Sequence, residues 1–147
     1  MPTFDNVLSG HLLVEGEKVT GANPLPVTLS GGGSPSVTVL SSVRNTGLTN
    51  TSSAIKGTAG IVYGWNFVNT NATPVYVKLY NVVTATVGTT TPARVLAVPA
   101  QGGFFLENSS IPQHNFTTAI SMACVTGIAD ADSTAPTTPI HAEVYYV

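Results

Sequence analysis

The stretch from Gly57 to Asn81 reads GTAGIVYGWNFVNTNATPVYVKLYN, and it holds the only tryptophan of the chain, four tyrosine or phenylalanine residues and one charge. Both of its halves alternate with a period of two, which is the periodicity of β-strands. The first half would place these residues on one face: Ile61, Tyr63, Trp65 and Phe67. The opposite face would then carry Val62, Gly64, Asn66 and Val68. The sequence predicts that the two halves are the arms of a hairpin.

The second half divides in the same way. Val75, Val77 and Leu79 would share one face, and Tyr76, Lys78 and Tyr80 would share the other. Alternating apolar sets of this kind are usually buried, so we expect the set around Trp65 to lie in the core. The face that contains a lysine is expected to be exposed. Because exposed tyrosines are good contact residues, Tyr76 and Tyr80 are candidate partner-binding residues.

Further strands are predicted on both sides of this stretch, in runs rich in β-branched residues at 26–29, 36–43, 94–98, 117–126 and 140–147. The segments between them have turn and loop compositions, among them NTGLTNTSS at 45–53, PAQGG at 99–103 and GIADADSTAPTTP at 127–139. No segment keeps a helical apolar face. The fold class is therefore predicted to be all-β, an antiparallel β-sandwich or a jelly-roll-like barrel.

The first 35 residues have a weaker periodicity than the rest of the chain. They are predicted to form an extended N-terminal arm ahead of a β-sandwich domain at 36–147. Pro24 and Pro26 favour extended backbone, and the glycines at 31–33 would act as a flexible joint. The arm would pack on a neighbouring subunit or form a first edge strand. Its candidate partner-binding residues are Pro24, Leu25, Pro26 and Val27.

Composition limits the classes of function. The chain has 147 residues, of which 8% are charged, and its net charge is −2. The basic residues are scattered singly, which argues against nucleic-acid binding because phosphates require clustered Lys and Arg. No apolar run reaches the roughly 18 residues of a membrane helix, and no signal peptide is apparent. With Cys124 as the only cysteine, no intrachain disulfide forms, and we expect folding in a reducing cytoplasm.

Residues that could carry chemistry are few. A nucleophile and base would have to come from Cys124 and from three dispersed histidines: His11, His114 and His141. Cys124 lies in an alternating apolar run and is expected to be buried. Asp130 and Asp132 resemble the opening of a calcium loop without its glycine and closing glutamate, so we interpret them as a solvated turn. The sequence predicts no catalytic site, metal site or cofactor.

Three motifs occur in a characteristic order: the G-W-N of residues 64–66, V-G-T-x-x-P at 87–92 and T-G-I-A-D-x-D at 126–132. This series, over about Gly57 to Val147, resembles a small β-domain of virion-associated proteins of tailed bacteriophages. The resemblance implies a capsid decoration or cement protein in some phages and a tail or fibre component in others. Decoration proteins of this kind form homo-oligomers, often trimers, on the outer capsid surface of the virion.

The hypothesis that follows is a non-enzymatic decoration protein, made in the host cytoplasm, whose arm and one apolar face clamp adjacent major capsid proteins. Low charge, compact β-structure and an exchangeable arm suit a shell protein made in many copies. The alternative is a tail or fibre module that binds host-surface glycans through exposed aromatic residues and amides. A hydrolase is disfavoured because positioned titratable groups are scarce.

Overall fold

The computed structural model describes residues 13–14, 17–18, 39–106 and 111–147. The chain divides into two units between Val37 and Thr38, close to the predicted boundary after residue 35. In the first unit, β1 (Leu13–Val14) pairs antiparallel with β2 (Glu17–Lys18). The arm residues predicted to bind a partner, 24–27, and the glycines at 31–33 lie outside the described residues.

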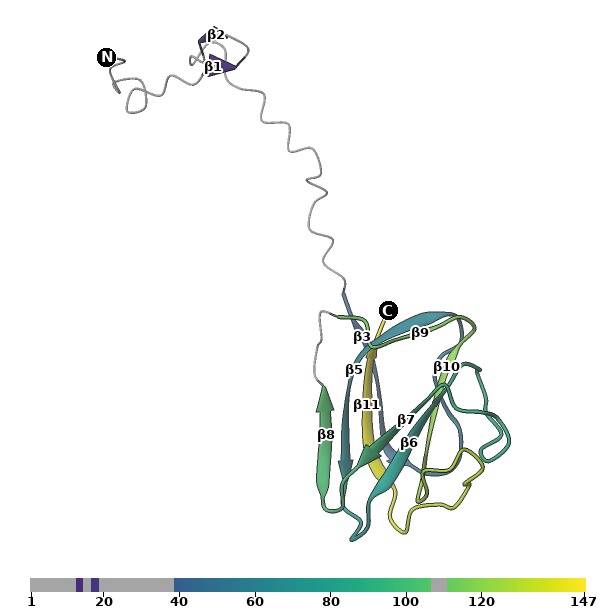
Figure 1. Ribbon diagram of the computed structural model, residues 1–147. Helices are drawn as coiled ribbons and strands as arrows, with labels where there is room; N and C mark the ends of the chain where they lie inside the picture. The colour runs from purple at the N-terminus through teal and green to yellow at the C-terminus, as the bar shows by residue number, and fades with distance from the viewer. Residues whose placement is uncertain (1–12, 15–16, 19–38, 107–110) are drawn as a thin grey trace. The chain divides into compact units, whose positions relative to one another are not determined.

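The second unit is an all-β sandwich of two antiparallel sheets, which confirms the predicted fold class and selects the sandwich from the two architectures considered (Figure 1). The four-stranded sheet has the order β4 (Ser53–Lys56), β10 (Ile120–Val125), β6 (Val75–Tyr80) and β7 (Arg94–Val98). The five-stranded sheet has the order β3 (Ser41–Leu48), β11 (Ile140–Tyr146), β5 (Gly60–Asn69) and β8 (Gly102–Leu106). In the same sheet β9 (His114–Phe116) pairs with the first residues of β5.

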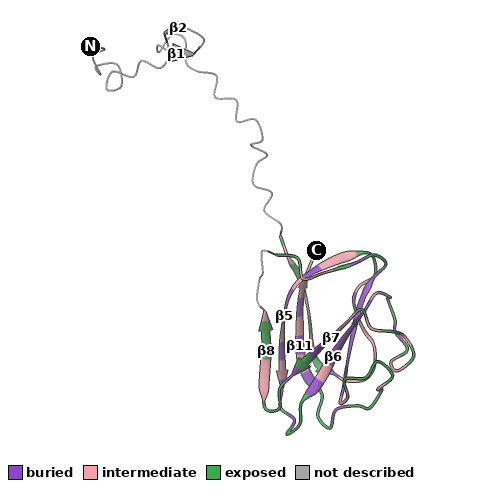
Figure 2. Ribbon diagram, viewed as in Figure 1, coloured by how far each residue is buried: buried purple, intermediate pink, exposed green. Residues whose placement is uncertain are grey.

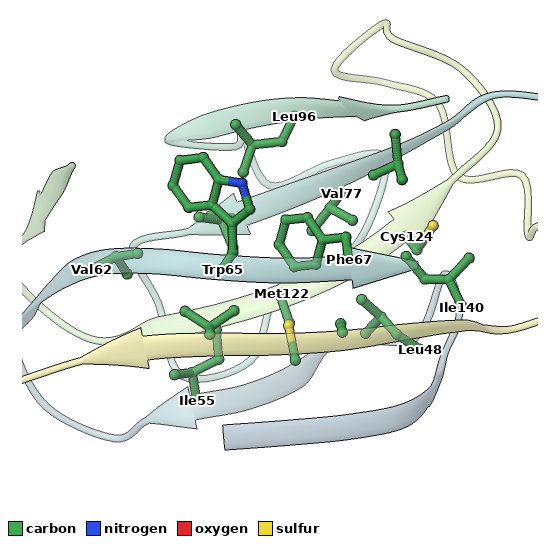
Figure 3. Close-up of a cluster of buried hydrophobic side chains, with 14 of the residues drawn as sticks. Leu48, Ile55, Val62, Trp65, Phe67, Val77, Leu96, Met122, Cys124 and Ile140 are labelled. Carbon is green, nitrogen blue, oxygen red and sulfur yellow. The ribbon is translucent and has the colours of Figure 1, made fainter. Parts of the chain in front are cut away.

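The core lies between the two sheets and is built from their inward-facing side chains (Figure 3). From β5, the rings of Trp65 and Phe67 stack at a centroid distance of 6.2 Å. From the opposite sheet, Val77, Leu96 and Met122 pack into the same cluster. Trp65 is 2% exposed and Phe67 is fully buried, so their predicted place in the core is confirmed.

The prediction for the other two members of that face, Ile61 and Tyr63, is wrong. Both are partly exposed, and Val62 is fully buried instead. The cause is a β-bulge, because Tyr145 pairs with Gly64 while the next residue of β11 pairs with Val62. One extra residue in β5 reverses the side-chain alternation at that point, and strict period-two reasoning from the sequence does not detect it.

The predicted hairpin is also wrong, although both of its strands exist. β5 pairs with β11, β8 and β9, whereas β6 pairs with β10 and β7, so the chain passes from one sheet to the other after Asn69. In this arrangement the apolar faces around Trp65 and Val77 cover each other across the sandwich. Two strands of one hairpin would have presented both faces on the same side of a single sheet, where neither covers the other.

Two asparagines organise this crossing. The side-chain amide of Asn69 donates to the carbonyl oxygens of Thr73 at 2.9 Å and Pro99 at 3.0 Å, and its Oδ1 accepts from the backbone and side-chain amides of Asn71. Asn71 in turn exchanges two hydrogen bonds with the backbone of Thr138. The bonds join the crossing to the segments that follow β7 and precede β11, which satisfies buried polar groups at the end of the sandwich.

The outer face of the four-stranded sheet is covered by the loops at 81–93 and 126–139, contrary to the expectation that Lys78 and its neighbours are exposed. Lys78 Nζ is fully buried with its side chain and donates to three carbonyl oxygens of the second loop, those of Ala129 (2.8 Å), Asp130 (3.0 Å) and Asp132 (2.8 Å). Tyr80 packs in a small second cluster with buried residues Ala85 and Ala123.

In the second unit, three strands were not predicted, β4, β8 and β9, and β3 ends five residues beyond the predicted run at 36–43. The end of β3 and the first residue of β4 lie in the polar segment 45–53, and β8 begins within the segment 99–103; both segments are interpreted from the sequence as loops. β9 has only three residues. Short polar or glycine-containing strands have weak intrinsic preference, so their pairing is decided by the neighbouring strands.

Candidate interaction surface

The two sheets differ in how their outer faces are covered. All six residues of β10 are buried, as are five of the six in β6, because loops cover that sheet. In β11 the pattern alternates: Ile140, Ala142 and Val144 are buried, whereas the residues between them are partly exposed. Within the part of the chain that the structure describes, the outer face of the five-stranded sheet is thus the uncovered one.

We call this surface the open face. Its central row crosses four strands in register, since Glu143 of β11 pairs with Arg44 of β3 and with Asn66 of β5, and Asn66 pairs with Phe105 of β8. The open face consists of this row and its neighbours on either side: Ser42, Tyr145 and Gly64, and then His141, Val68 and Gly103. It is polar at the β3 end and apolar at the β8 end.

Asn66 supplies an unused acceptor in the middle of the open face. Its Oδ1 is buried and receives no hydrogen bond from the described residues. A buried carbonyl oxygen without a donor carries a desolvation cost. The cross-strand neighbours of Asn66 are Glu143 on one side and Phe105 on the other, so charge, amide and aromatic ring follow one another along the row.

A shallow hollow of about 310 Å³ lies at the β8 end of the open face. Its lining includes Thr70, Gln101, Phe105 and the two glycines that open β8. The ring of Phe105 lies over Gly103, because a Cβ built on that glycine would come within 2.0 Å of the ring. Glycine at this position is therefore what allows the ring to lie flat along the strand, with 54% of the phenylalanine exposed.

β8 is also an edge strand with unusual composition. Among the described residues, β5 is the strand that pairs with it, and its sequence GGFFL has no charged residue. Phe104 is 36% exposed although its ring meets Trp65 at 5.6 Å. Figure 2 shows β8 coloured as intermediate and exposed along its length, in contrast to the buried residues of β6. An exposed apolar edge of this kind leaves backbone groups that could pair with another strand.

The two tyrosines predicted to bind a partner differ in their exposure. Tyr76 is partly exposed on β6, between Val125 and Ala97 of the neighbouring strands. Tyr80 is fully buried, so its predicted exposure is wrong: the loop at 81–93 covers it. Burial, with the Asp130 carboxylate nearby, raises the pKa of the Tyr80 phenol, which keeps it neutral.

The candidate catalytic groups are not brought together. Cys124 is buried, as predicted, and burial raises the pKa of its thiol to about 12 although a hydrogen bond from the Tyr76 amide acts the other way. His114 pairs with Val62 and His141 with Val68, at opposite ends of β5. Burial, together with the charge of Arg94, lowers the pKa of His114, whose ring contacts Phe116. His11 lies outside the described residues.

The acidic pair forms the predicted turn. Asp132 Oδ2 accepts a hydrogen bond from the Gly127 amide at 2.7 Å, and Oδ1 accepts from the hydroxyl of Thr134 at 2.9 Å. Burial acts to raise the pKa of Asp132, but these hydrogen bonds and the Lys78 ammonium outweigh it and hold the pKa below its ordinary value. The described residues contain no cluster of His, Cys, Asp and Glu that could hold a metal ion.

The open face was not identified from the sequence. Phe105 lies beside a glycine pair whose sequence predicts a turn. The signal that was available is the Phe-Phe pair at 104–105 directly after those glycines. Comparison with family models, with curated proteins and with solved structures found no match to this chain. The described residues form no helix, and hence none able to cross a membrane.

Proposed function

We propose that the protein is a non-enzymatic structural protein of a tailed-bacteriophage virion, a decoration or cement protein that binds the outer capsid surface and stabilises contacts between major capsid proteins. The observation that carries the proposal is the asymmetry of the sandwich. Loops cover β10 and β6 on the outer face of one sheet, whereas the open face of the other presents a register-aligned row from Arg44 to Phe105. An uncovered sheet face suits the surface of another folded protein.

The energetics of the open face support a protein partner. Arg44 and Glu143 are neighbours of opposite charge, which makes orientation on the partner specific, and the apolar β8 end adds hydrophobic area. The motif resemblance over about Gly57 to Val147 favours the major capsid protein as that partner, with the predicted arm at 1–35 as a second contact.

A second candidate function is a tail or fibre module that binds host-surface glycans. The hollow at the β8 end favours it, because an exposed aromatic ring, Phe105, lies beside the polar side chains of Thr70 and Gln101. Sugars bind where a ring can stack on their apolar face and amides reach their hydroxyls. This glycan site at Phe105 replaces the site predicted around Tyr80, because Tyr80 is buried.

The test is the stoichiometry of the protein in purified particles of the phage that encodes it. Hundreds of copies per particle support a decoration protein, a handful supports the tail module, and absence from the particle contradicts both. Glu143→Arg on the open face should abolish co-sedimentation with shells of the major capsid protein. Asp130→Arg, the matched charge reversal on the exposed loop of the other sheet, should leave it unchanged.

Binding to a glycan array distinguishes the second candidate. Loss of an array signal in Phe105→Ala, with retention in Tyr76→Ala, supports glycan binding in the hollow. A silent array together with full shell occupancy supports the decoration protein and contradicts the glycan module. Equal shell binding by Glu143→Arg and the wild type would contradict the role of the open face.

A further inference from the structure

Among the four strands at the ends of the two sheet orders, β8 is the one without a Lys or Arg; the three-residue β9, which pairs with β5, also has none. The sheet orders place β3 and β8 at the edges of one sheet and β4 and β7 at the edges of the other. Each of the other three carries one Lys or Arg: Arg44 in β3, Lys56 in β4 and Arg94 in β7. Charged residues on edges oppose the addition of foreign strands. The edge of β8 therefore lacks the protection that its counterparts have.

The apolar surface at this edge is substantial. Phe104 closes the side of the core against Trp65 and yet remains 36% exposed, and Phe105 is 54% exposed on the open face. A strand added beside β8 would cover both rings and would pair with the backbone groups of β8 on the side away from β5. We propose that β8 accepts residues 25–29 of a second copy of this chain as an added antiparallel strand.

The sequence of that segment fits an edge strand. Residues 24–29 read PLPVTL, so the apolar residues Leu25, Val27 and Leu29 alternate with prolines or threonine. In an antiparallel strand the N–H and C=O of one residue point to the same side, and successive residues alternate sides. A segment bonded to β8 through residues 25, 27 and 29 leaves the N–H positions of 24, 26 and 28 on the free side. Both prolines occur at those positions, where a missing N–H costs no ladder hydrogen bond.

The direction of the strands favours a second copy over the chain's own segment. β3 and β5 both run antiparallel to β11, and β8 runs antiparallel to β5, so a strand added antiparallel to β8 runs in the direction of β3. After residue 29 the same chain would have to return along the strand, about 17 Å, and cross about 19 Å of sheet to enter β3. Residues 30–40 would need roughly two thirds of their full reach, laid across the open face or around the end of the sheet. A segment from another copy has no such constraint.

The contact is heterologous, since the donated segment and the accepting edge are different surfaces. Repetition of a heterologous contact closes into a ring when its rotation permits. The inference concerns association of the chain with itself, so purified protein without any virion component tests it. It stands or fails separately from the proposed function.

The experiment is sedimentation velocity of the full-length chain over a range of concentrations. Wild type should be oligomeric. Val27→Pro removes an N–H that the proposal directs at β8, and it should weaken association by roughly tenfold or more. Thr28→Pro is the matched control, because its N–H would point away from β8, and it should associate like wild type. Equal behaviour of the two proline variants would overturn the proposal.

The accepting edge is tested by Phe105→Lys, which adds the missing basic residue and should also weaken association. Ala97→Lys, on an exposed position of β7, is its control and should remain oligomeric. Trp65 fluorescence and circular dichroism establish that each variant is folded.

Mixing Val27→Pro with Phe105→Lys tests whether the segment comes from a second copy. Val27→Pro retains an intact β8 edge and Phe105→Lys retains an intact segment, so a one-to-one heterodimer should form. A monomeric wild type, or a mixture that stays monomeric, would show that no second copy is bound.

Discussion

Replacing Lys78 with methionine tests whether the buried ammonium holds the loop at 126–139 onto the four-stranded sheet. Methionine keeps an unbranched apolar stem and removes the charge. The wild-type Nζ donates three hydrogen bonds of 2.8, 3.0 and 2.8 Å to backbone carbonyl oxygens of the loop. These bonds connect one strand to a segment about 50 residues later in sequence, so their loss should release the loop.

The expected loss in the free energy of unfolding follows from these contacts. A hydrogen bond to a charged group contributes about 1.5–3 kcal/mol, so three would sum to about 4.5–9 kcal/mol. Two effects reduce this figure. Burying an ammonium costs several kcal/mol, which methionine does not incur. The carbonyls also belong to exposed residues such as Ala129, where water can replace the lost donor. We expect a net loss of about 2–4 kcal/mol.

The assay is urea unfolding at a fixed protein concentration, followed by the fluorescence of Trp65, the only tryptophan and 2% exposed in the fold. In thermal unfolding the same loss in the free energy of unfolding should lower the midpoint by about 8–16 °C, at roughly 4 °C per kcal/mol for a domain of this size. Lys56→Met, at a partly exposed position of β4, is the control and should change stability by less than about 0.5 kcal/mol. If Lys78→Met is as stable as this control, the ammonium does not hold the loop.

Three further predictions concern an asparagine, an aspartate and the cysteine. Asn69→Asp would place a carboxylate against backbone carbonyl oxygens and should cost about 4 kcal/mol or prevent folding, whereas Asn115→Asp, at an exposed position, should be near neutral in the same urea assay. Because the pKa of Asp132 is held low, its stabilisation is present above the unfolded carboxyl pKa and is lost as pH falls through the folded value. The urea midpoint of wild type should therefore fall in acid, and that of Asp132→Asn should fall less; parallel profiles would contradict this account. Cys124, with its pKa near 12, should resist a thiol reagent at pH 8 until urea unfolds the chain, and rapid labelling of the native protein would show that it is accessible.

Much of the strand content was predictable, because period two and β-branched composition are local properties. β7 at 94–98 was predicted with its observed bounds, and β10 and β11 lie within the predicted runs. The burial of Trp65 and Phe67 followed from the same pattern. The site was far less accessible to sequence reasoning. Its row joins residues from β3, β5, β8 and β11, and only strand register brings these together.

Two errors show where local reasoning stops. The stretch from Gly57 to Asn81 contains two amphipathic strands, and a hairpin and a crossing between sheets both account for that pattern. Local periodicity is equal in the two cases, so the choice depends on which strands elsewhere in the chain supply pairing partners. In this fold β11 and β10 do so, in separate sheets. The hydrogen bonds of the Asn69 side chain then stabilise the segment that crosses from one sheet to the other.

By itself, therefore, the sequence determined that this chain is all-β, that Trp65 and Phe67 lie in the core and that Cys124 is buried, since each depends on composition and period. Only the tertiary structure decided that loops bury Lys78 and Tyr80 on one sheet while the other keeps an open face. The physical reason is that a strand pattern specifies which side chains share a face. Whether that face meets the core, a loop or solvent depends on segments far away in sequence.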